Sequence, residues 1–219
     1  MVGTLTTQQG QGLTLAIHVK YTNHPENFDW LLSLAETAAQ DPHIAILTSS
    51  TADRFNARVE VTAGFSSAIF TGSAGEQDRV WVAIVGVFTS NTSRDIYVDV
   101  IGDKGFNTTS RAMSTALDHI TVGTSPTLAA DFAGFLAEAA IWDVALSTED
   151  ITSYLNGECA SGIDSSNLIG YYPLDTSNST QTNEGVDASG NLTVTNATFA
   201  ADHPIITCGA TATFRRRQM

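Results

Sequence analysis

Three aspartates, Asp95, Asp99 and Asp103, are spaced four residues apart in a stretch whose apolar residues alternate as they do in a β-strand. Residues four apart on a strand point to the same face and lie about 13 Å from each other. Carboxylates at that separation share neither a proton nor a single metal ion. The pattern therefore predicts the solvated faces of a β-hairpin rather than an acid pair.

Other catalytic patterns are also not recognisable in the sequence. There is no Ser/His/Asp set, no phosphate-binding glycine loop and no zinc-ligand spacing, and Glu138 stands alone. Cys159 and Cys208 are the only cysteines. We expect two unpaired thiols, with a disulfide as the alternative. The sequence therefore predicts no catalytic residue, no cofactor and no enzymatic activity.

Five aromatic side chains could stack on sugar rings if they were exposed: Trp30, Trp81, Trp142, Tyr171 and Tyr172. Trp81, Trp142 and one tyrosine of the adjacent pair fall in strand patterns. Because large aromatic residues in such strands contribute much of the buried apolar area, core packing is the prediction for them.

A chain of many short strands must position these residues. The segments 80–88 and 135–142 are apolar on both faces, which is typical of strands inside a sandwich. Residues 30–39 fit either a short helix or an extended run. In the strand at 135–142, period two places four residues on one face: Phe135, Ala137, Ala139 and Ile141. Together the strands predict an all-β fold, a two-sheet antiparallel jelly-roll sandwich.

One short helix is expected near residues 147–156. Ser147 is a good N-cap residue, and Asp150 three positions later completes a near capping box. Gly157 stands where a C′ glycine would end the helix. A buried strand should therefore lead through a short link into a single amphipathic helix.

The chain has 219 residues and a formal net charge of −13 at pH 7. That length suits one large β domain, and so acidic a body should repel nucleic acid and anionic membranes. We expect a polar leader at 1–12, a sandwich at 13–208 and a basic tail at 209–219. The leader has neither the basic region nor the apolar region of a signal peptide.

Three stretches, in this order, resemble the laminin-G-like domains of the concanavalin A-like lectin/glucanase superfamily. The segment from Trp81 to Gly102 is similar to the family's central hairpin, which ends Tyr-x-Asp-Gly, although Val100 replaces the final glycine. The run GFLAEAAIWDVALSTEDITSYLNG at 134–157 resembles its closing strand and helix. LIGYYPL at 168–174, followed by DASGNL, resembles its late aromatic strand and D-x-SGN turn.

The resemblance implies a concanavalin A-like sandwich and two kinds of site. Many relatives bind Ca²⁺ through loop oxygens, and Asp99, Asp103 and Asp187 are the acids at comparable positions. Relatives that hydrolyse glucans carry Glu-x-Asp-x-x-Glu on one strand. Because no such run occurs here, a glycoside hydrolase is the weakest of the functions considered.

Domains of this sequence style are common in phage virion proteins. The resemblance therefore implies a non-enzymatic virion protein that decorates the capsid or belongs to a tail fibre, with an added glycan-adhesive role. Its expected partners are the major capsid protein or tail proteins, host surface glycans and further copies of itself, on a virion assembled in the host cytoplasm. The alternative is a carbohydrate-binding module of a bacterial surface protein.

The basic tail is the predicted contact with other proteins. Arg215, Arg216 and Arg217 form a cationic cluster on an otherwise acidic chain. Three guanidinium groups can fix register on a carboxylate-rich neighbouring surface.

Overall fold

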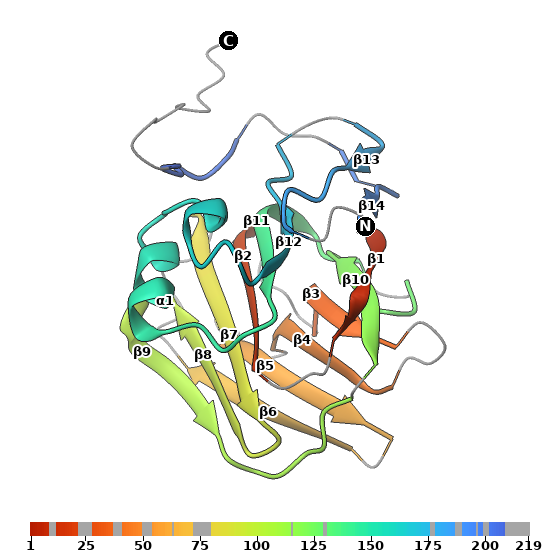
Figure 1. Ribbon diagram of the computed structural model, residues 1–219, viewed down its shortest axis with the longest axis vertical. Helices are drawn as coiled ribbons and strands as arrows, with labels where there is room; N and C mark the ends of the chain where they lie inside the picture. Colours follow the sequence, from red (N-terminus) through yellow and green to blue (C-terminus); the bar gives the residue numbers. More distant parts are fainter. Residues whose placement is uncertain are drawn as a thin grey trace.

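The computed structural model describes residues 1–8, 12–21, 28–36, 41–49, 54–62, 64–71, 80–114, 116–128, 131–175, 178–186, 190–195, 197–198 and 202–208. These residues form two antiparallel sheets and one α-helix (Figure 1). The predicted all-β jelly-roll sandwich with a short helix is confirmed. In this part of the chain, no helix is long and apolar enough to cross a membrane.

The larger sheet has eight strands in the described residues. Their spatial order is β13 (Thr180–Gln181), β14 (Leu192–Thr193), β1 (Val2–Gln8), β10 (Leu117–Val122), β3 (Trp30–Ala35), β4 (His43–Thr48), β5 (Arg54–Val61) and β6 (Gly64–Thr71). The smaller sheet has six strands in the same described part of the chain. Their order is β12 (Leu168–Tyr172), β11 (Gly134–Trp142), β2 (Leu13–Tyr21), β7 (Val82–Ser90), β8 (Ser93–Val98) and β9 (Val100–Asn107).

Two sequence-based expectations change at the start of the chain. Residues 1–12 were expected to be a leader outside the sandwich, but Val2–Gln8 form β1 and pair with β10. Val2 and Leu5 are the only large apolar residues of this strand, and their spacing of three does not give the period-two signal of a strand. The ambiguous stretch 30–39 forms strand β3 over Trp30–Ala35.

The smaller sheet is buried on both faces, which explains why its strands are apolar on both sides. Its inner face packs on the larger sheet in a core that includes Leu15, Ile84 and Ile141. Its outer face contributes Val85 and Trp142 to a second core. That core is covered by helix α1 (Thr148–Leu155) and the short 3₁₀ helix η2 (Ala160–Gly162).

Strand β11 changes faces at Glu138. The register against β2 shifts by one residue between Ala137 and Ala140, and Glu138 has a φ of 55°, so the strand contains a β-bulge. Leu136 packs toward the inner core before the bulge, and Ile141 does so after it. A common face was predicted for Phe135, Ala137, Ala139 and Ile141. This prediction is wrong, because the bulge puts the first two residues on the opposite face from the last two.

Helix α1 begins and ends where the sequence predicts. The Ser147 hydroxyl accepts a hydrogen bond from the Asp150 amide at 3.2 Å and donates one to its carboxylate at 2.7 Å. Gly157 follows the helix with a φ of 83°, and its amide donates to the Tyr154 carbonyl at 2.9 Å. A left-handed residue at this position is the common way to end a helix, and glycine adopts it without a steric penalty.

The two sheets approach each other directly at one edge of the sandwich, where β6 lies against β9. A Cβ atom added to Gly105 of β9 would lie 2.1 Å from the Ile69 carbonyl oxygen of β6. Nearby, the Ser66 hydroxyl donates to the Asn107 side chain at 2.8 Å. We call this contact the β6–β9 seam.

Candidate functional site

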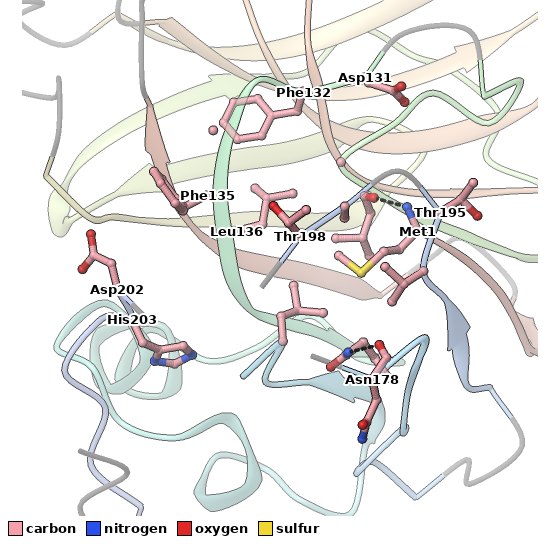
Figure 2. Close-up of a pocket in the computed structure, with 17 residues that line it drawn as sticks. Met1, Asp131, Phe132, Phe135, Leu136, Asn178, Thr195, Thr198, Asp202 and His203 are labelled. Carbon is pink, nitrogen blue, oxygen red and sulfur yellow. Dashed lines mark hydrogen bonds between the residues drawn. The ribbon is translucent and has the colours of Figure 1, made fainter. Parts of the chain in front are cut away.

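A cavity of about 270 Å³ lies beside the N-terminal half of β11 (Figure 2). The loop before β11, β11 itself, the segments that flank β13 and β14, and the C-terminal segment all contribute to its walls. Apart from Met1 at the start of the chain, the labelled side chains come from these four regions: Asp131, Phe132, Phe135, Leu136, Asn178, Thr195, Thr198, Asp202 and His203.

The cavity lining combines exposed polar groups with apolar surface. Asp131, Asn178 and Thr198 are exposed, whereas the rings of Phe132 and Phe135 are half-buried. A concave surface with apolar rings and a few convergent polar groups fits a ligand that has both hydroxyl groups and apolar faces. The site is therefore suited to binding, with several groups that could fix a ligand's orientation.

Asp202 is held at the rim of the cavity by Lys20 of the smaller sheet and by Trp81, the residue before β7. Lys20 of β2 forms an ion pair with it, and the indole nitrogen of Trp81 donates to its carboxylate at 3.3 Å. The hydrogen bond from Lys20 lowers the pKa of Asp202. The Lys20 ammonium also lies 5.9 Å from the ring centroid of Phe135. Phe135, Lys20 and Trp81 therefore come together beside the cavity.

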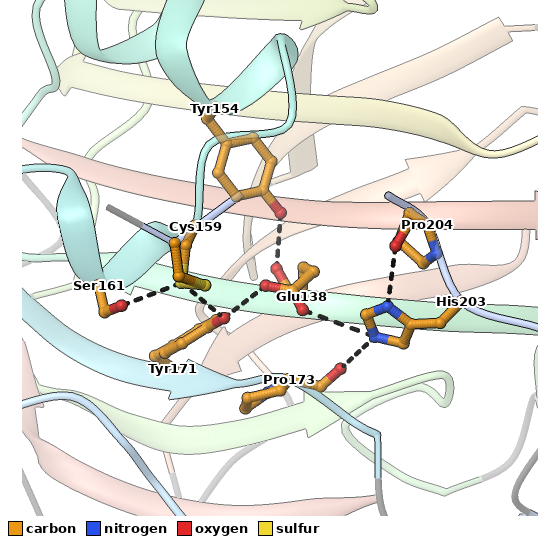
Figure 3. A network of polar contacts seen from close by, with 9 residues as sticks. Glu138, Tyr154, Cys159, Ser161, Tyr171, Pro173, His203 and Pro204 are labelled. Atoms are coloured by element: carbon orange, nitrogen blue, oxygen red, sulfur yellow. Dashed lines mark hydrogen bonds and ion pairs between the residues drawn. A yellow bond between two sulfur atoms is a disulfide. The ribbon is translucent and has the colours of Figure 1, made fainter. Parts of the chain in front are cut away.

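A buried polar network connects Glu138 to the C-terminal segment (Figure 3). Glu138 is 3% exposed and accepts a hydrogen bond from the Tyr171 hydroxyl at 2.5 Å. Its other carboxylate oxygen lies 3.5 Å from Nε2 of His203. That nitrogen is also 3.2 Å from the Pro173 carbonyl, and Nδ1 is 3.1 Å from the Pro204 carbonyl. Each His203 ring nitrogen that carries a proton thus has an acceptor.

Two further buried groups adjoin this network. The Tyr154 hydroxyl donates to the Glu138 carbonyl at 2.6 Å, and burial, followed by the charge of Glu138, raises the pKa of Tyr154. The His18 ring lies 5.0 Å from the Tyr154 ring. Burial, with a smaller effect from His203, lowers the pKa of His18 to about 3. His18 is therefore neutral at physiological pH.

Cys159 and Cys208 form a disulfide, so the expectation of two unpaired thiols is wrong. The two residues are 49 positions apart in sequence. Sequence alone does not show that the segment after α1 and the C-terminal segment lie side by side in the fold. The bond joins the end of the α1 region to the C-terminal segment. A parallel bridge between Glu158 and Thr207 lies beside it.

The predicted calcium and partner-binding residues do not form a site in the described residues. Asp99 is exposed, and its carboxylate accepts a hydrogen bond from the Ala83 amide at 2.8 Å. The side chain of Asp103, Asp187 and the cluster Arg215–Arg217 lie outside the described residues. Within the described part of the chain, no three His, Cys, Asp or Glu side chains gather where they could hold a metal ion. Calcium binding remains an expectation.

The five aromatic candidates for stacking differ in how far they are buried. Trp142, Tyr171 and Tyr172 are buried, which confirms the core packing predicted for Trp142 and for one tyrosine of the pair. Trp30 and Trp81 are only partly buried, so the predicted core packing is wrong for Trp81, which precedes strand β7 (Val82–Ser90) instead of lying in it. Of the five candidates for stacking, Trp81 is the one that contacts a residue of the cavity rim.

Sequence reasoning missed the cavity and the partners of Glu138. The available signal was a glutamate within an apolar strand, because a buried carboxylate requires hydrogen-bond or charge partners. That sequence signal does not identify Tyr171 and His203 as the partners of Glu138. The cavity walls come from segments far apart in sequence, so their proximity depends on the sheet order.

Comparisons with known proteins agree with this architecture. The sequence profile of the concanavalin A-like lectin/glucanases superfamily matches residues 2–152. A search of curated protein sequences gives no match. A putative carbohydrate binding protein from Bacteroides ovatus has a similar structure, with a TM-score of 0.57 and 12% identity over 92% of this chain and 59% of that chain.

Two other solved structures are similar in fold. The CBM40 domain of the Ruminococcus gnavus IT-sialidase has a TM-score of 0.51 and 15% identity, over 68% of this chain and 83% of that chain. The enzymatically active domain of tailspike protein 2 from bacteriophage CBA120 has a TM-score of 0.53 and 13% identity, over 78% of this chain and 27% of that chain. These identities show a shared fold alone. Since the sequence profile covers most of the chain, the protein belongs to the concanavalin A-like lectin/glucanases superfamily.

Proposed function

We propose that this domain binds glycans without acting on them chemically, and that the cavity beside β11 is the binding site. The observation that carries the proposal is the lining itself: exposed hydrogen-bonding groups surround half-buried aromatic rings in a space of about 270 Å³. Sugars present hydroxyl groups at their edges and apolar C–H surfaces on their faces, and this lining offers partners for both. The structural similarity to the putative carbohydrate binding protein from Bacteroides ovatus supports the same assignment.

We propose binding rather than catalysis because of the interactions that the two lining carboxylates, Asp131 and Asp202, already make. Asp202 is already committed to Lys20 and Trp81. The other lining carboxylate, Asp131, is exposed, and its charge interacts with the Met1 ammonium group. Glycoside hydrolysis ordinarily requires an acid and a second carboxylate that acts as base or nucleophile. Because one of the two rim carboxylates is held in an ion pair, the pair is better suited to positioning a ligand than to hydrolysing it.

A glycan array with matched variants tests the assignment. The array should contain neutral oligosaccharides and their sialylated counterparts, since the lining alone does not choose between them. Asp131→Asn should weaken binding about tenfold, because a hydrogen bond to a charged group contributes about 1.5 kcal/mol or more. Glu149→Gln, which removes an exposed acid from the first turn of α1, is the control and should bind like the parent. Equal binding by all three proteins would exclude the cavity as the site.

A second candidate function concerns where the domain works. We propose that it is a structural component of a phage particle, in a tail fibre or on the capsid, where glycan binding would serve adhesion to the host. The tailspike neighbour supports this setting, since it is a phage protein and covers 78% of this chain. Virion proteins, host glycans and other copies of the chain would then be its partners.

Particle association is tested by fractionation. The full chain should co-sediment with assembled particles, and deletion of residues 215–219 should reduce its occupancy at low salt if the arginine cluster contacts an acidic neighbour. Unchanged occupancy would show that residues 215–219 do not contribute to particle association. A chain that never co-sediments with particles would favour the alternative of a carbohydrate-binding module from a bacterial surface protein.

A further inference from the structure

Residues 202–208, which we call the C-terminal strap, cross the outside of the smaller sheet and are fastened at two places. At one end, Asp202 pairs with Lys20, and His203 contacts Glu138 and the Pro173 carbonyl. The residues of this end, Asp202 and His203, are also a wall of the cavity. The strap is thus part of the candidate binding site.

At the other end, the strap is fastened by backbone bonds and by the disulfide. The Cys159 amide donates to the Thr207 carbonyl at 2.9 Å, and the Thr207 amide donates to the Gly157 carbonyl at 2.8 Å. The bond between Cys159 and Cys208 joins the same two segments covalently. Ile205, between the two fastenings, is 87% exposed, so the middle of the strap contributes little burial.

The two fastenings are connected to each other through the buried network (Figure 3). The Tyr171 hydroxyl lies 3.4 Å from the sulfur of Cys159 and donates to Glu138, whose carboxylate faces His203. A disulfide sulfur has no proton to give, so the Tyr171 oxygen receives no hydrogen bond from it. A reduced Cys159 thiol could donate to that oxygen. The hydrogen bonding of the network therefore depends on the state of the sulfur.

We propose that the Cys159–Cys208 disulfide is a redox latch on the candidate binding site: with the bond formed, the strap completes the cavity wall, and reduction releases the strap and weakens ligand binding. The ligand part of this inference rests on the proposed glycan-binding function. The release of the strap does not. A site of this kind would be complete under oxidising conditions and open under the reducing conditions of a cytoplasm.

The structure also indicates how the latch would open. Cys159 is 2% exposed, whereas Cys208 is partly exposed, so a thiolate from solvent would attack the sulfur of Cys208. The S–S bond breaks, its electron pair leaves on Cys159, and a mixed disulfide forms at Cys208. A second thiol of the same reductant displaces Cys208 and closes its own disulfide. Two electrons pass from the dithiol to the protein, and each cysteine takes up one proton.

One neighbour of Cys159 favours this direction of attack. The Ser161 hydroxyl lies 3.0 Å from the Cys159 sulfur and can donate a hydrogen bond to the thiolate as it leaves. Since a better-stabilised leaving thiolate leaves faster, Ser161→Ala should slow reduction by dithiothreitol severalfold. An unchanged rate would show that the sulfur of Cys159 is not the leaving group.

Amide hydrogen exchange of the whole chain tests the release of the strap without any ligand. After reduction with dithiothreitol, the Thr207 amide should exchange at least tenfold faster, while the Val85 amide in β7 should keep its rate. The double variant Cys159→Ser, Cys208→Ser should give the fast Thr207 rate with or without dithiothreitol. Unchanged protection at Thr207 would overturn the proposal. So would equal acceleration at Val85, because the disulfide would then hold the whole fold rather than the strap.

The oligosaccharide array tests the effect on binding. An oligosaccharide captured by the oxidised protein should bind at least tenfold more weakly after reduction, and reoxidation should restore it. Equal binding in both states, with the strap released, would overturn the link between latch and site. If the oxidised protein captures nothing, the proposed function fails, and the exchange experiment still decides whether the disulfide holds the strap.

Discussion

The two halves of strand β11 have the same backbone conformation and different surroundings. From Ala139 to Trp142 the strand is fully buried and pairs with β2 on one side and β12 on the other. From Gly134 to Leu136 it pairs with β2, is partly exposed and borders the cavity. The bulge at Glu138 separates them. A single inserted residue thus ends the core and begins the candidate site within one strand.

This difference teaches that one group of buried polar side chains gathers at the boundary between the two halves of β11. Glu138 lies at the bulge itself, and His18 of β2 pairs with Ala137 beside it. Tyr154 reaches the same place from helix α1. Bulges are common next to functional sites because they redirect side chains and interrupt strand pairing. Substitutions on the two sides should therefore have different consequences, and five predictions follow this division.

The largest effect is expected in the buried half. Trp142 is fully buried, and its indole nitrogen donates to the Ile163 carbonyl at 2.9 Å. Trp142→Asp or Ile141→Asp would bury an unpaired charge and should lower the free energy of unfolding by about 4 kcal/mol or more. Urea midpoints measure the loss. Phe135→Asp in the site half is the control and should be far milder; melting temperatures equal to the parent's for both core variants would contradict the division.

Acid should destabilise the boundary through His18. The groups that face it are Tyr154, from α1, and His203, from the strap. Its pKa is about 3 in the folded protein and about 6.5 in the unfolded chain. The unfolded state therefore binds a proton first, and stability should fall as pH drops from about 6.5 toward 3, by up to about 1.4 kcal/mol for each pH unit. His18→Phe should flatten this dependence between pH 6.5 and 4; an unchanged slope would contradict the assignment.

Removing the charge at the bulge should have an intermediate effect. Glu138→Gln keeps the size of the side chain but weakens its contacts with Tyr171 and His203. Because hydrogen bonds to charged groups contribute about 1.5–3 kcal/mol, we expect a loss of that order in the free energy of unfolding. Glu149→Gln, on the exposed helix surface, is the matched control. If both variants had the same urea midpoint as the parent, the buried carboxylate would not support the bulge.

The helix that covers the buried half should respond to loss of its cap. Ser147→Ala removes the hydrogen bond to the Asp150 amide and should cost about 1 kcal/mol. Glu149→Gln weakens only the favourable charge at the helix N-terminus and should cost less. Chemical denaturation of both variants gives the order. A reversed order would mean that the cap contributes less to the helix than the charge does.

The smallest effect on stability is expected in the site half. Phe135 is half-buried at the cavity and lies near Lys20, so Phe135→Ala should change the free energy of unfolding by about 0.5 kcal/mol. Its binding of array glycans should fall clearly below that of the parent. A variant that loses stability and keeps binding would place Phe135 in the core rather than in the site.

The sequence predicts most of the fold because its local signals agree with the global structure. Ser147, Asp150 and Gly157 mark both ends of α1, and the apolar segments predict the interior strands. Strand β1 was missed because Val2 and Leu5 are three residues apart, which is not the period-two spacing of a strand. The face of Phe135 was missed because a bulge depends on the backbone at Glu138, which the period of the side chains does not report.

The candidate site was predictable to a much smaller extent. Each of its parts depends on contacts between segments that are distant in sequence, such as Lys20 with Asp202 and Glu138 with His203. The disulfide is a similar case, because two isolated cysteines do not reveal their distance in space. Sequence patterns identify residues that must be buried or exposed, but the sheet order decides which of them meet.

The β6–β9 seam affects how copies of this domain behave when they are close together. Outer strands of sheets expose unpaired amide and carbonyl groups, which can pair with another chain and cause aggregation. Here the outer strands β6 and β9 are pressed against each other. Their backbones are so close that only glycine fits at position 105. Gly105 therefore helps each sheet to protect the edge of the other. A domain with a closed edge of this kind can be displayed at high density with less risk of strand exchange between neighbours.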